Sequence, residues 1–336
     1  MNTFIYETSI VDPYYNLAVE DSLCRYVSSA TVRGEKLCGL FLWQSDKVVV
    51  IGRNQNPAYE CDMSVLKKNQ VKLARRLTGG GAVYQDLGNL NYSFISSDDE
   101  TAVEDHLEIV LRTLKRFGIN ANCSGRNDIV TLQNRKVSGT AQKRYKDAFL
   151  LHGTLLVDLD KEMAEQCLTP NQFKLASKSI RSVSARIVNI SDIIGRCTVH
   201  DIRECMKEEF WSEYAKTEHI EPILSESDIE ENCRRLSDHE WIMGSELSDY
   251  WIVQKQWGTV RFSILEDGGC IRSVKYETDC IEVDFIALFF DGMKGMKLDR
   301  KNLLQYLTVV RKENLSHKQC IQMAADLIEK IVSELQ

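Results

Sequence analysis

The sequence lacks any apolar run long enough to cross a membrane. Its start, MNTFIYETSIVDPYYNLAVED, has neither a basic leader nor an uninterrupted apolar stretch, and no later segment reaches the roughly 18 apolar residues of a spanning helix. Secretion and membrane insertion are therefore not expected, and we predict a cytoplasmic protein.

The eleven cysteines contain no CxxC pair. An odd number of scattered cysteines argues against a disulfide framework, and the missing pair argues against a zinc site. We expect reduced thiols, most of them acting as small buried side chains.

An excess of positive charge is also missing. The chain has 42 Lys and Arg against 49 Asp and Glu, a formal net charge of −7. A partner with many phosphates needs a basic face, so nucleic acid is not the expected ligand. Cations gather only locally, near a run of three glycines and the segment that follows it: Arg75, Arg76, Arg126, Arg135, Lys136, Lys143 and Arg144.

What is present is an ordinary globular composition, 43% apolar and 27% charged, in 336 residues. This length favours one large domain and a smaller one. The composition becomes acidic and broken after about residue 220, and strand patterns recur from about residue 245. We predict a first domain over 1–240 and a smaller second domain over 245–336, without internal repeats.

The local patterns predict helices and strands in an α+β arrangement with a mixed sheet. Asp12-Pro13 is typical of a helix start and predicts a helix over about 13–28, and apolar spacing predicts another over 102–117. Strands are predicted at 37–44 and 47–52 as a hairpin, on both sides of the three glycines, on both sides of a turn at Gln133-Asn134, and in FLLHGTLLVD. In the tail, Gly268-Gly269 predicts a hairpin and the last 20 residues an amphipathic helix.

The segment RRLTGGGAVYQDLGNLNYSF places Gly79, Gly80 and Gly81 directly after two arginines. Three glycines are costly to order, so the run indicates a backbone that something approaches closely. Backbone N–H groups and arginines suit an anion, and phosphate is the natural guest. No lysine follows the glycines, so the run is not an ordinary P-loop, and a plain tight turn remains an alternative.

A second cluster, SGRNDIVTLQNRKVSGTAQ, holds Lys136 immediately before Val137-Ser138-Gly139. Small neighbours leave room for a lysine ammonium to enter a pocket. A solvated strand lysine and a turn capped by Asn127 and Asp128 are the alternatives.

These blocks, in this order, resemble the lipoate-protein ligases of the biotin and lipoate ligase superfamily. The resemblance rests on RRLTGGGAVYQDLGNLNYSF, GRNDIV and RKVSGTAQ, and extends to YYNLAVED, FLWQSDKVVVIGRNQNPAYEC, HGTLLVDLD and KSIRSVSARIVN. It implies the mixed-sheet catalytic domain of that superfamily over 1–240. The tail resembles the small C-terminal α+β accessory domain of the longer ligases, with EWIMG and QWGTVRF as markers.

The resemblance implies a two-step reaction. Lipoate and ATP, with Mg²⁺, form lipoyl-AMP and pyrophosphate, and the lipoyl group then passes to a lysine of an acceptor. The acceptors implied are E2 subunits of 2-oxoacid dehydrogenases and the glycine cleavage H protein, and we expect a monomer.

The resemblance also implies site residues. Lys136 is the candidate catalytic residue, bridging the lipoate carboxylate and the α-phosphate, two anions that repel. Asn127 and Asp128 are candidates to contact adenylate or magnesium, with Asp128 as the candidate metal ligand. The residues expected to hold the nucleotide are Arg76, Gly79, Gly80, Gly81, Ala82, Val83 and Tyr84, and those expected near the lipoate are Leu17, Val19, Trp43, Lys136 and His152.

One position departs from the family pattern, which has histidine in GGGAVYHD where this chain has Gln85. Glutamine hydrogen-bonds but does not titrate, so a role that needs imidazole is absent there or taken over.

Three other functions stay open at this stage. An ATP-independent lipoyl or octanoyl transferase needs an activated cysteine, and Cys123 is the cysteine nearest the motifs. A biotin ligase is disfavoured because a GRGR-type loop is missing. A lipoate-binding protein without catalysis is disfavoured because Lys136 and the glycine run are both retained.

Overall fold

The computed structural model describes residues 1–97, 102–124, 127–169, 186–244, 247, 249–314 and 317–335. Its packing divides the chain into two compact units. Unit 1 comprises Met1–Ile51, Pro57–Arg76 and Ala82–Met243, and unit 2 comprises Gly52–Asn56, Leu77–Gly81 and Gly244–Gln336. The glycine run thus packs with the C-terminal residues. Among the described residues, no helix has the length and apolar character to cross a membrane.

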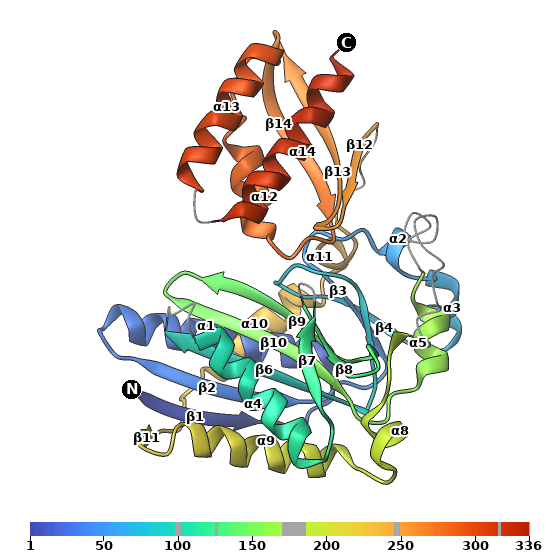
Figure 1. Ribbon diagram of the computed structural model, residues 1–336, viewed down its shortest axis with the longest axis vertical. Helices are drawn as coiled ribbons and strands as arrows, with labels where there is room; N and C mark the ends of the chain where they lie inside the picture. Colours follow the sequence, from blue (N-terminus) through green and yellow to red (C-terminus); the bar gives the residue numbers. More distant parts are fainter. Residues whose placement is uncertain are drawn as a thin grey trace. The chain divides into compact units, whose positions relative to one another are not determined.

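Unit 1 is built on a mixed sheet in which eight described strands run in the order β11-β1-β2-β6-β10-β9-β8-β7 (Figure 1). β11, β1 and β2 are parallel neighbours, and the remaining neighbours are antiparallel. The strands are β1 (Asn2–Glu7), β2 (Leu37–Trp43), β6 (Asn89–Ser97), β7 (Ala121–Ser124), β8 (Asp128–Thr131), β9 (Lys136–Tyr145), β10 (Ala148–Leu156) and β11 (Glu218–His219).

The two faces of this sheet carry different side chains, because successive strand residues point to opposite faces. On one face, alternate residues of β2, β6 and β10 are apolar and fully buried against α4 (Ala102–Arg116) and α9 (Val199–Glu213). We call this the core face. The opposite face carries Trp43, Ser93 and His152 beneath α1 (Pro13–Val32), and we call it the polar face.

Helix α1 begins as the sequence predicts. The Asp12 carboxylate accepts hydrogen bonds from the backbone N–H groups of Tyr14 and Tyr15, both at 3.0 Å, and Pro13 occupies the first turn where its missing N–H costs nothing. The helix runs four residues beyond the predicted end. Its middle is buried because the sheet lies on one side and α10 (Glu226–Leu236) on another, where Arg235 reaches the buried Asp21.

The predicted hairpin of 37–44 and 47–52 is wrong, although both strands exist. β2 belongs to the large sheet, whereas β3 (Val48–Ile51) lies at the centre of a small sheet, β4-β3-β5. β4 (Lys72–Arg75) and β5 (Val83–Gln85) are the strands predicted around the glycine run, and each pairs with β3. The two residues Ser45-Asp46 resemble a hairpin turn in sequence, but here the chain passes from the large sheet to the small one.

The turn predicted at Gln133-Asn134 is confirmed between β8 and β9. Asn134 has φ of +57°, a value that asparagine tolerates better than most residues, and its N–H donates to the carbonyl of Thr131 at 2.8 Å. The helix predicted over 102–117 is α4. The other helices of unit 1 among the described residues are α2 (Pro57–Glu60), α3 (Met63–Lys68), α5 (Lys161–Cys167), α8 (Ile190–Ile194) and α11 (His239–Met243).

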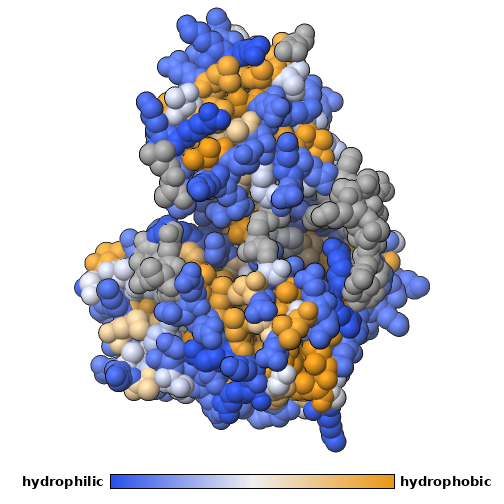
Figure 2. Space-filling view, in the orientation of Figure 1, coloured by the Kyte–Doolittle hydropathy of each residue, from blue (hydrophilic) through white to orange (hydrophobic). Residues whose placement is uncertain are grey.

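Unit 2 has a three-stranded antiparallel sheet, β12 (Trp251–Lys255), β13 (Gly258–Asp267) and β14 (Cys270–Thr278), with three helices around one apolar core. The predicted hairpin at Gly268-Gly269 is confirmed, with φ of +60° and +80°. The helices are α12 (Val283–Asp291), α13 (Arg300–Glu313) and α14 (Lys318–Glu334), and α14 buries the predicted apolar face apart from Leu335, which lies beyond its end. Figure 2 shows a mostly hydrophilic visible surface interrupted by smaller apolar areas.

Candidate active site

A buried cluster of polar side chains lies on the polar face beneath α1. Ser93 donates to the Glu20 carboxylate at 2.5 Å, and Nδ1 of His152 lies 2.8 Å from the same oxygen. The indole N–H of Trp43 donates to Ser93 at 3.2 Å. Because a carboxylate oxygen accepts, His152 donates from Nδ1, and Glu20 therefore fixes its ring orientation and tautomer.

The arginines before the glycine run have different partners. Arg75 donates from Nε to the carbonyl of Trp241 at 2.8 Å and from Nη2 to that of Ile242 at 2.7 Å, and the Trp241 indole donates back to the carbonyl of Arg75 at 3.1 Å. Arg75 therefore holds α11 against the small sheet.

Arg76 is buried and donates from Nη1 to the carbonyl of Val50 at 3.2 Å. Burial lowers the pKa of Arg76 to about 10, and the negative charge of Glu20 opposes that effect. The guanidinium therefore stays charged at neutral pH and adds a cation to the surroundings of the Glu20 cluster.

Lys136 begins β9, and its ammonium lies 2.6 Å from Oδ1 of Asp128 in β8. Both side chains are partly exposed, at 26% and 40%. A Cβ built on Gly139 would lie 2.6 Å from Nζ of Lys136. The small residue that the sequence placed near the lysine is therefore directly under its ammonium.

The three glycines have three different surroundings, all within unit 2. A Cβ at Gly79 would lie 2.5 Å from the carbonyl oxygen of Cys280 and 2.5 Å from Val283, so the turn before α12 packs on it. Gly80 has φ of +88°, and its N–H donates to the carbonyl of Cys280 at 3.0 Å. A Cβ at Gly81 would meet nothing within 4 Å. A close approach exists as predicted, and in this structure a turn of the chain itself makes it.

The residues after the glycines lie in or next to β5. Tyr84 is buried in a core that includes Val49 and Leu66, and Ala82 packs against the same core. Val83 is on the other side of the strand and is partly exposed. The side chains of Ala82 and Tyr84 belong to the core. At these two residues, only the backbone groups are therefore suited to bind a ligand.

Asn127 precedes β8, and its carbonyl accepts from the N–H of Thr140 at 2.7 Å and from the Thr140 hydroxyl at 3.3 Å. This carbonyl ties the end of the GRND block to β9, next to Lys136 and Asp128.

Leu17 and Val19 are both buried on α1 but lie about 200° apart around the helix. Leu17 is three residues from Glu20 and so shares its side, which faces the polar cluster. Val19 lies about 100° from Glu20. The structure thus brings Trp43 and His152 together at the Glu20 cluster, and helix geometry places Leu17 nearer than Val19 to the side of α1 that carries Glu20.

Gln85, at the position that departs from the family pattern, is buried and accepts from the amide of Asn91 at 3.3 Å. Asn91 in turn accepts from Asn89 at 3.0 Å. This ladder of neutral amides joins β5 to β6 without a titratable group.

The described residues contain no group of three or more His, Cys, Asp or Glu side chains placed to hold a metal ion. Asp128, the candidate ligand, has an ammonium 2.6 Å from its oxygen. A Mg²⁺ ion would be repelled there, so these residues do not fit a resident magnesium site.

Residues 12–211 match the family model of the lipoyl protein ligase A/B catalytic domain. The chain belongs to this family. It is 34% identical over 301 residues to a lipoate-protein ligase A of Bdellovibrio bacteriovorus, a match that covers 87% of each chain.

Three solved lipoate-ligase structures share the fold. P. falciparum LipL1 in complex with lipoate has a TM-score of 0.76 and 27% identity, covering 91% of this chain and 94% of that one. A lipoate-protein ligase A bound with ATP has a TM-score of 0.59 and 27% identity, covering 72% and 98%. A bipartite ligase from Thermoplasma acidophilum, studied with its E2 lipoyl domain, has a TM-score of 0.58 and 27% identity, covering 74% and 98%. The predicted family, α+β fold class and ligase enzyme class are confirmed.

The thiol-dependent transferase is not favoured by these relatives, and the local chemistry agrees. Burial, and next the charge of Glu108, raises the pKa of the Cys123 thiol. An activated cysteine needs the opposite shift.

Sequence reasoning missed Glu20 and Ser93, whereas it named Gly139 as one of the small residues beside Lys136. Glu20 stands in the quoted segment YYNLAVED, as an acid on a helix that starts with an apolar stripe, and such a residue needs a partner when it is buried. Ser93 had no signal, because its hydrogen-bond partners Glu20 and Trp43 come from two other elements, α1 and β2.

Proposed function

We propose that this ligase activates lipoate with ATP, forming lipoyl-AMP and pyrophosphate, and then transfers the lipoyl group to a lysine of an acceptor domain. The observation that carries the proposal is the Lys136 ammonium, held beside a glycine at the start of β9. Relatives solved with lipoate and with ATP support the two substrates.

In the first step a lipoate carboxylate oxygen bonds to the α-phosphorus while the bond to the β-phosphate oxygen breaks and pyrophosphate leaves. Both reactants are anions, so a fixed cation between them lowers the barrier. We assign this role to Lys136, which neutralises charge and exchanges no proton. Mg²⁺ accompanies ATP on its phosphate oxygens.

The nucleotide contacts stay predictions at Arg76, at the backbone from Gly79 to Tyr84, and at Asn127 and Asp128. Among the glycines, Gly81 suits this role best, because nothing lies where its side chain would be.

For lipoate we propose a pocket on the polar face, bounded by Leu17, Trp43 and His152, with Val19 contributing at its side. Apolar walls suit the dithiolane tail, and a few oriented polar groups suit its end. The fixed ring of His152 supports this assignment.

Acceptors of the lipoyl group are proposed to be E2 lipoyl domains, which the Thermoplasma relative accompanies, and the glycine cleavage H protein. We expect the protein to act as a monomer in the cytoplasm, where its eleven free cysteines stay reduced.

The residues from 245 to 336 are proposed as an accessory domain that controls the order of events. Support comes from the turn before α12, which holds Gly79 and Gly80. Lipoyl-AMP is a mixed anhydride and must be kept from water until the acceptor arrives. A domain that holds the glycine run can move together with that run when it shields the intermediate.

The experiment measures pyrophosphate release from ATP with and without lipoate, and then lipoyl attachment to an E2 lipoyl domain by intact mass. Lipoate-dependent release followed by attachment supports the proposal. Attachment from a lipoylated donor protein, with neither ATP nor lipoyl-AMP present, would favour the transferase instead. Binding of lipoate without either step would favour a lipoate-binding protein.

A further inference from the structure

The strands β8 and β9 hold Lys136 from two sides. Asp128 lies directly opposite Gly139 in the strand register, and the Lys136 side chain folds back across that pair so that Nζ is 2.6 Å from Asp128 Oδ1. An ion pair this exposed contributes little to the stability of a fold. Its effect is to limit where the ammonium lies.

Gly139 supplies the space for that ammonium. A Cβ there would lie 2.6 Å from Nζ and 2.8 Å from Cε of Lys136, both closer than real Cβ contacts. The backbone of Gly139 does not have a positive φ, so no turn requires glycine at this position. The lysine side chain is the contact that a larger residue would disturb.

We propose that Gly139 and Asp128 are positioning residues for Lys136, Gly139 by leaving the space and Asp128 by holding the charge. This inference rests on the proposed function, and it gives Asp128 a role other than that of a metal ligand. When lipoate and ATP bind, their anionic oxygens meet an ammonium that is already in place. The cost of ordering a flexible lysine is then met in folding and not in each catalytic cycle.

The first test is Gly139→Ala. The group that the new methyl meets is the flexible end of Lys136, so we expect the ammonium to shift while the strand stays in place. A shift on the order of an ångström would relieve the contact. A displacement of that size can lower a rate by about 100-fold. We expect the rate of lipoate-dependent pyrophosphate release to fall about 10- to 100-fold, with an unchanged melting temperature and KM values for lipoate and ATP within about 3-fold.

The matched control is the same substitution in a Lys136→Ala background, where the space is vacant. Single-turnover rates and lipoate affinity are measured for all four proteins of the cycle. If Gly139 acts through Lys136, Gly139→Ala has no further effect in that background. An equal loss in both backgrounds, a lowered melting temperature, or a wild-type rate for Gly139→Ala would each overturn the proposal.

The second test separates the two roles of Asp128. Asp128→Asn keeps the shape but loses the charge, so we expect a lower rate of adenylation with an unchanged Mg²⁺ concentration for half-maximal activity. A requirement for about 10-fold more Mg²⁺ at an unchanged maximal rate would make Asp128 a metal ligand and reject its positioning role. Wild-type protein is assayed beside both variants. Its failure to release pyrophosphate with lipoate would reject the proposed function itself, whereas an active wild type leaves the variants to decide the positioning roles.

Discussion

The core face and the polar face of the large sheet are made by alternate residues of the same strands, yet they bury different chemistry. On the core face Phe94 packs among apolar side chains of α4 and α9. On the polar face its neighbour Ser93 belongs to the Glu20 cluster. Neighbouring residues of one strand can therefore affect separate properties, stability on one face and chemistry on the other. A substitution on one face that changed the property of the other would show that the faces are not independent.

The largest expected effect is on the core face. Phe94→Ala removes a fully buried ring that stacks on His106 and lies close to Phe210, and such truncations cost about 3 to 5 kcal/mol. We expect the free energy of unfolding in urea to fall by that amount. The folded fraction of the variant should keep its lipoate and ATP affinities. Loss of affinity at full folding would show that the two faces are not separate.

The next effect is on catalysis at β9. Lys136→Ala removes a preorganised cation and should reduce adenylation by on the order of 3 kcal/mol in the transition state. Unfolding free energy should change little, because the ion pair with Asp128 is partly exposed. Near-normal lipoyl-AMP formation, measured in a single turnover, would remove Lys136 from the catalytic role.

The fold was largely predictable, because helix caps and apolar spacing are local signals. The caps of α1, the turn at Asn134 and the hairpin at Gly268-Gly269 all depend on residues close together in the sequence. The pairing of β2 and β3 was not predictable from their short link. Strand partners are chosen by packing over long separations, which a local pattern does not contain.

The candidate site was predictable only where a motif is contiguous. The run of three glycines gave a correct signal of close approach but not its source, since Gly79 contacts a turn 200 residues away in the sequence. Ser93 and His152 are paired in β6 and β10, and Glu20 meets both only because α1 crosses the sheet at that point. Residues so far apart in the sequence cannot be assigned to one site until the fold is known.

A smaller effect on stability is expected from the pH dependence of His106. His106 is fully buried on the core face, lies 3.3 Å from the Cys38 sulfur, and has its pKa lowered to about 4 by burial. Between pH 6.5 and pH 4 the unfolded chain binds a proton that the native protein does not. The free energy of unfolding therefore falls by up to about 1.4 kcal/mol per unit as the pH decreases through this window, giving about 1.6 kcal/mol between pH 6.5 and pH 5.

The control for that slope is His106→Phe, which keeps an aromatic ring against Phe94 but cannot titrate. Urea unfolding is measured for both proteins at pH 7, 6 and 5. The wild type should lose more stability than the variant as the pH falls. Parallel losses would mean that other groups carry the pH dependence and that His106 is protonated without cost.

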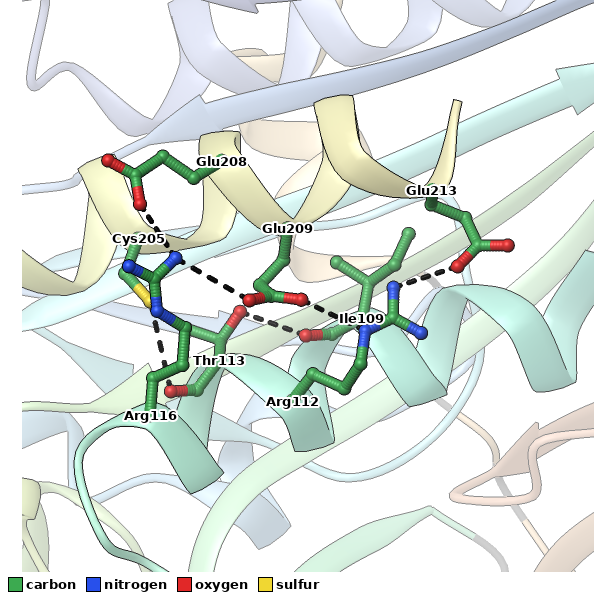
Figure 3. A network of polar contacts seen from close by, with 8 residues as sticks. All are labelled: Ile109, Arg112, Thr113, Arg116, Cys205, Glu208, Glu209 and Glu213. Carbon is green, nitrogen blue, oxygen red and sulfur yellow. Dashed lines mark hydrogen bonds and ion pairs between the residues drawn. The ribbon is translucent and has the colours of Figure 1, made fainter. Parts of the chain in front are cut away.

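The smallest effect lies on the outer side of the core-face helices, where ion pairs join α4 to α9 (Figure 3). Arg112 contacts Glu209 at 2.9 Å and Glu213 at 2.8 Å, and Arg116 contacts Glu208 at 2.6 Å. These charges are partly exposed, so solvent and salt screen them. Arg112→Ala should cost about 0.5 to 1 kcal/mol at low salt, and Lys115→Ala, which removes an exposed cation of the same helix, should cost less. Because screening removes the Coulomb attraction but not the packing of the arginine stem, the difference between the two variants should shrink in 1 M NaCl without reversing. A cost above about 2 kcal/mol that persists in salt would contradict this prediction. It would mean that Arg112 stabilises the protein as a core residue does, and that the outer side of α4 and α9 is not a solvated surface.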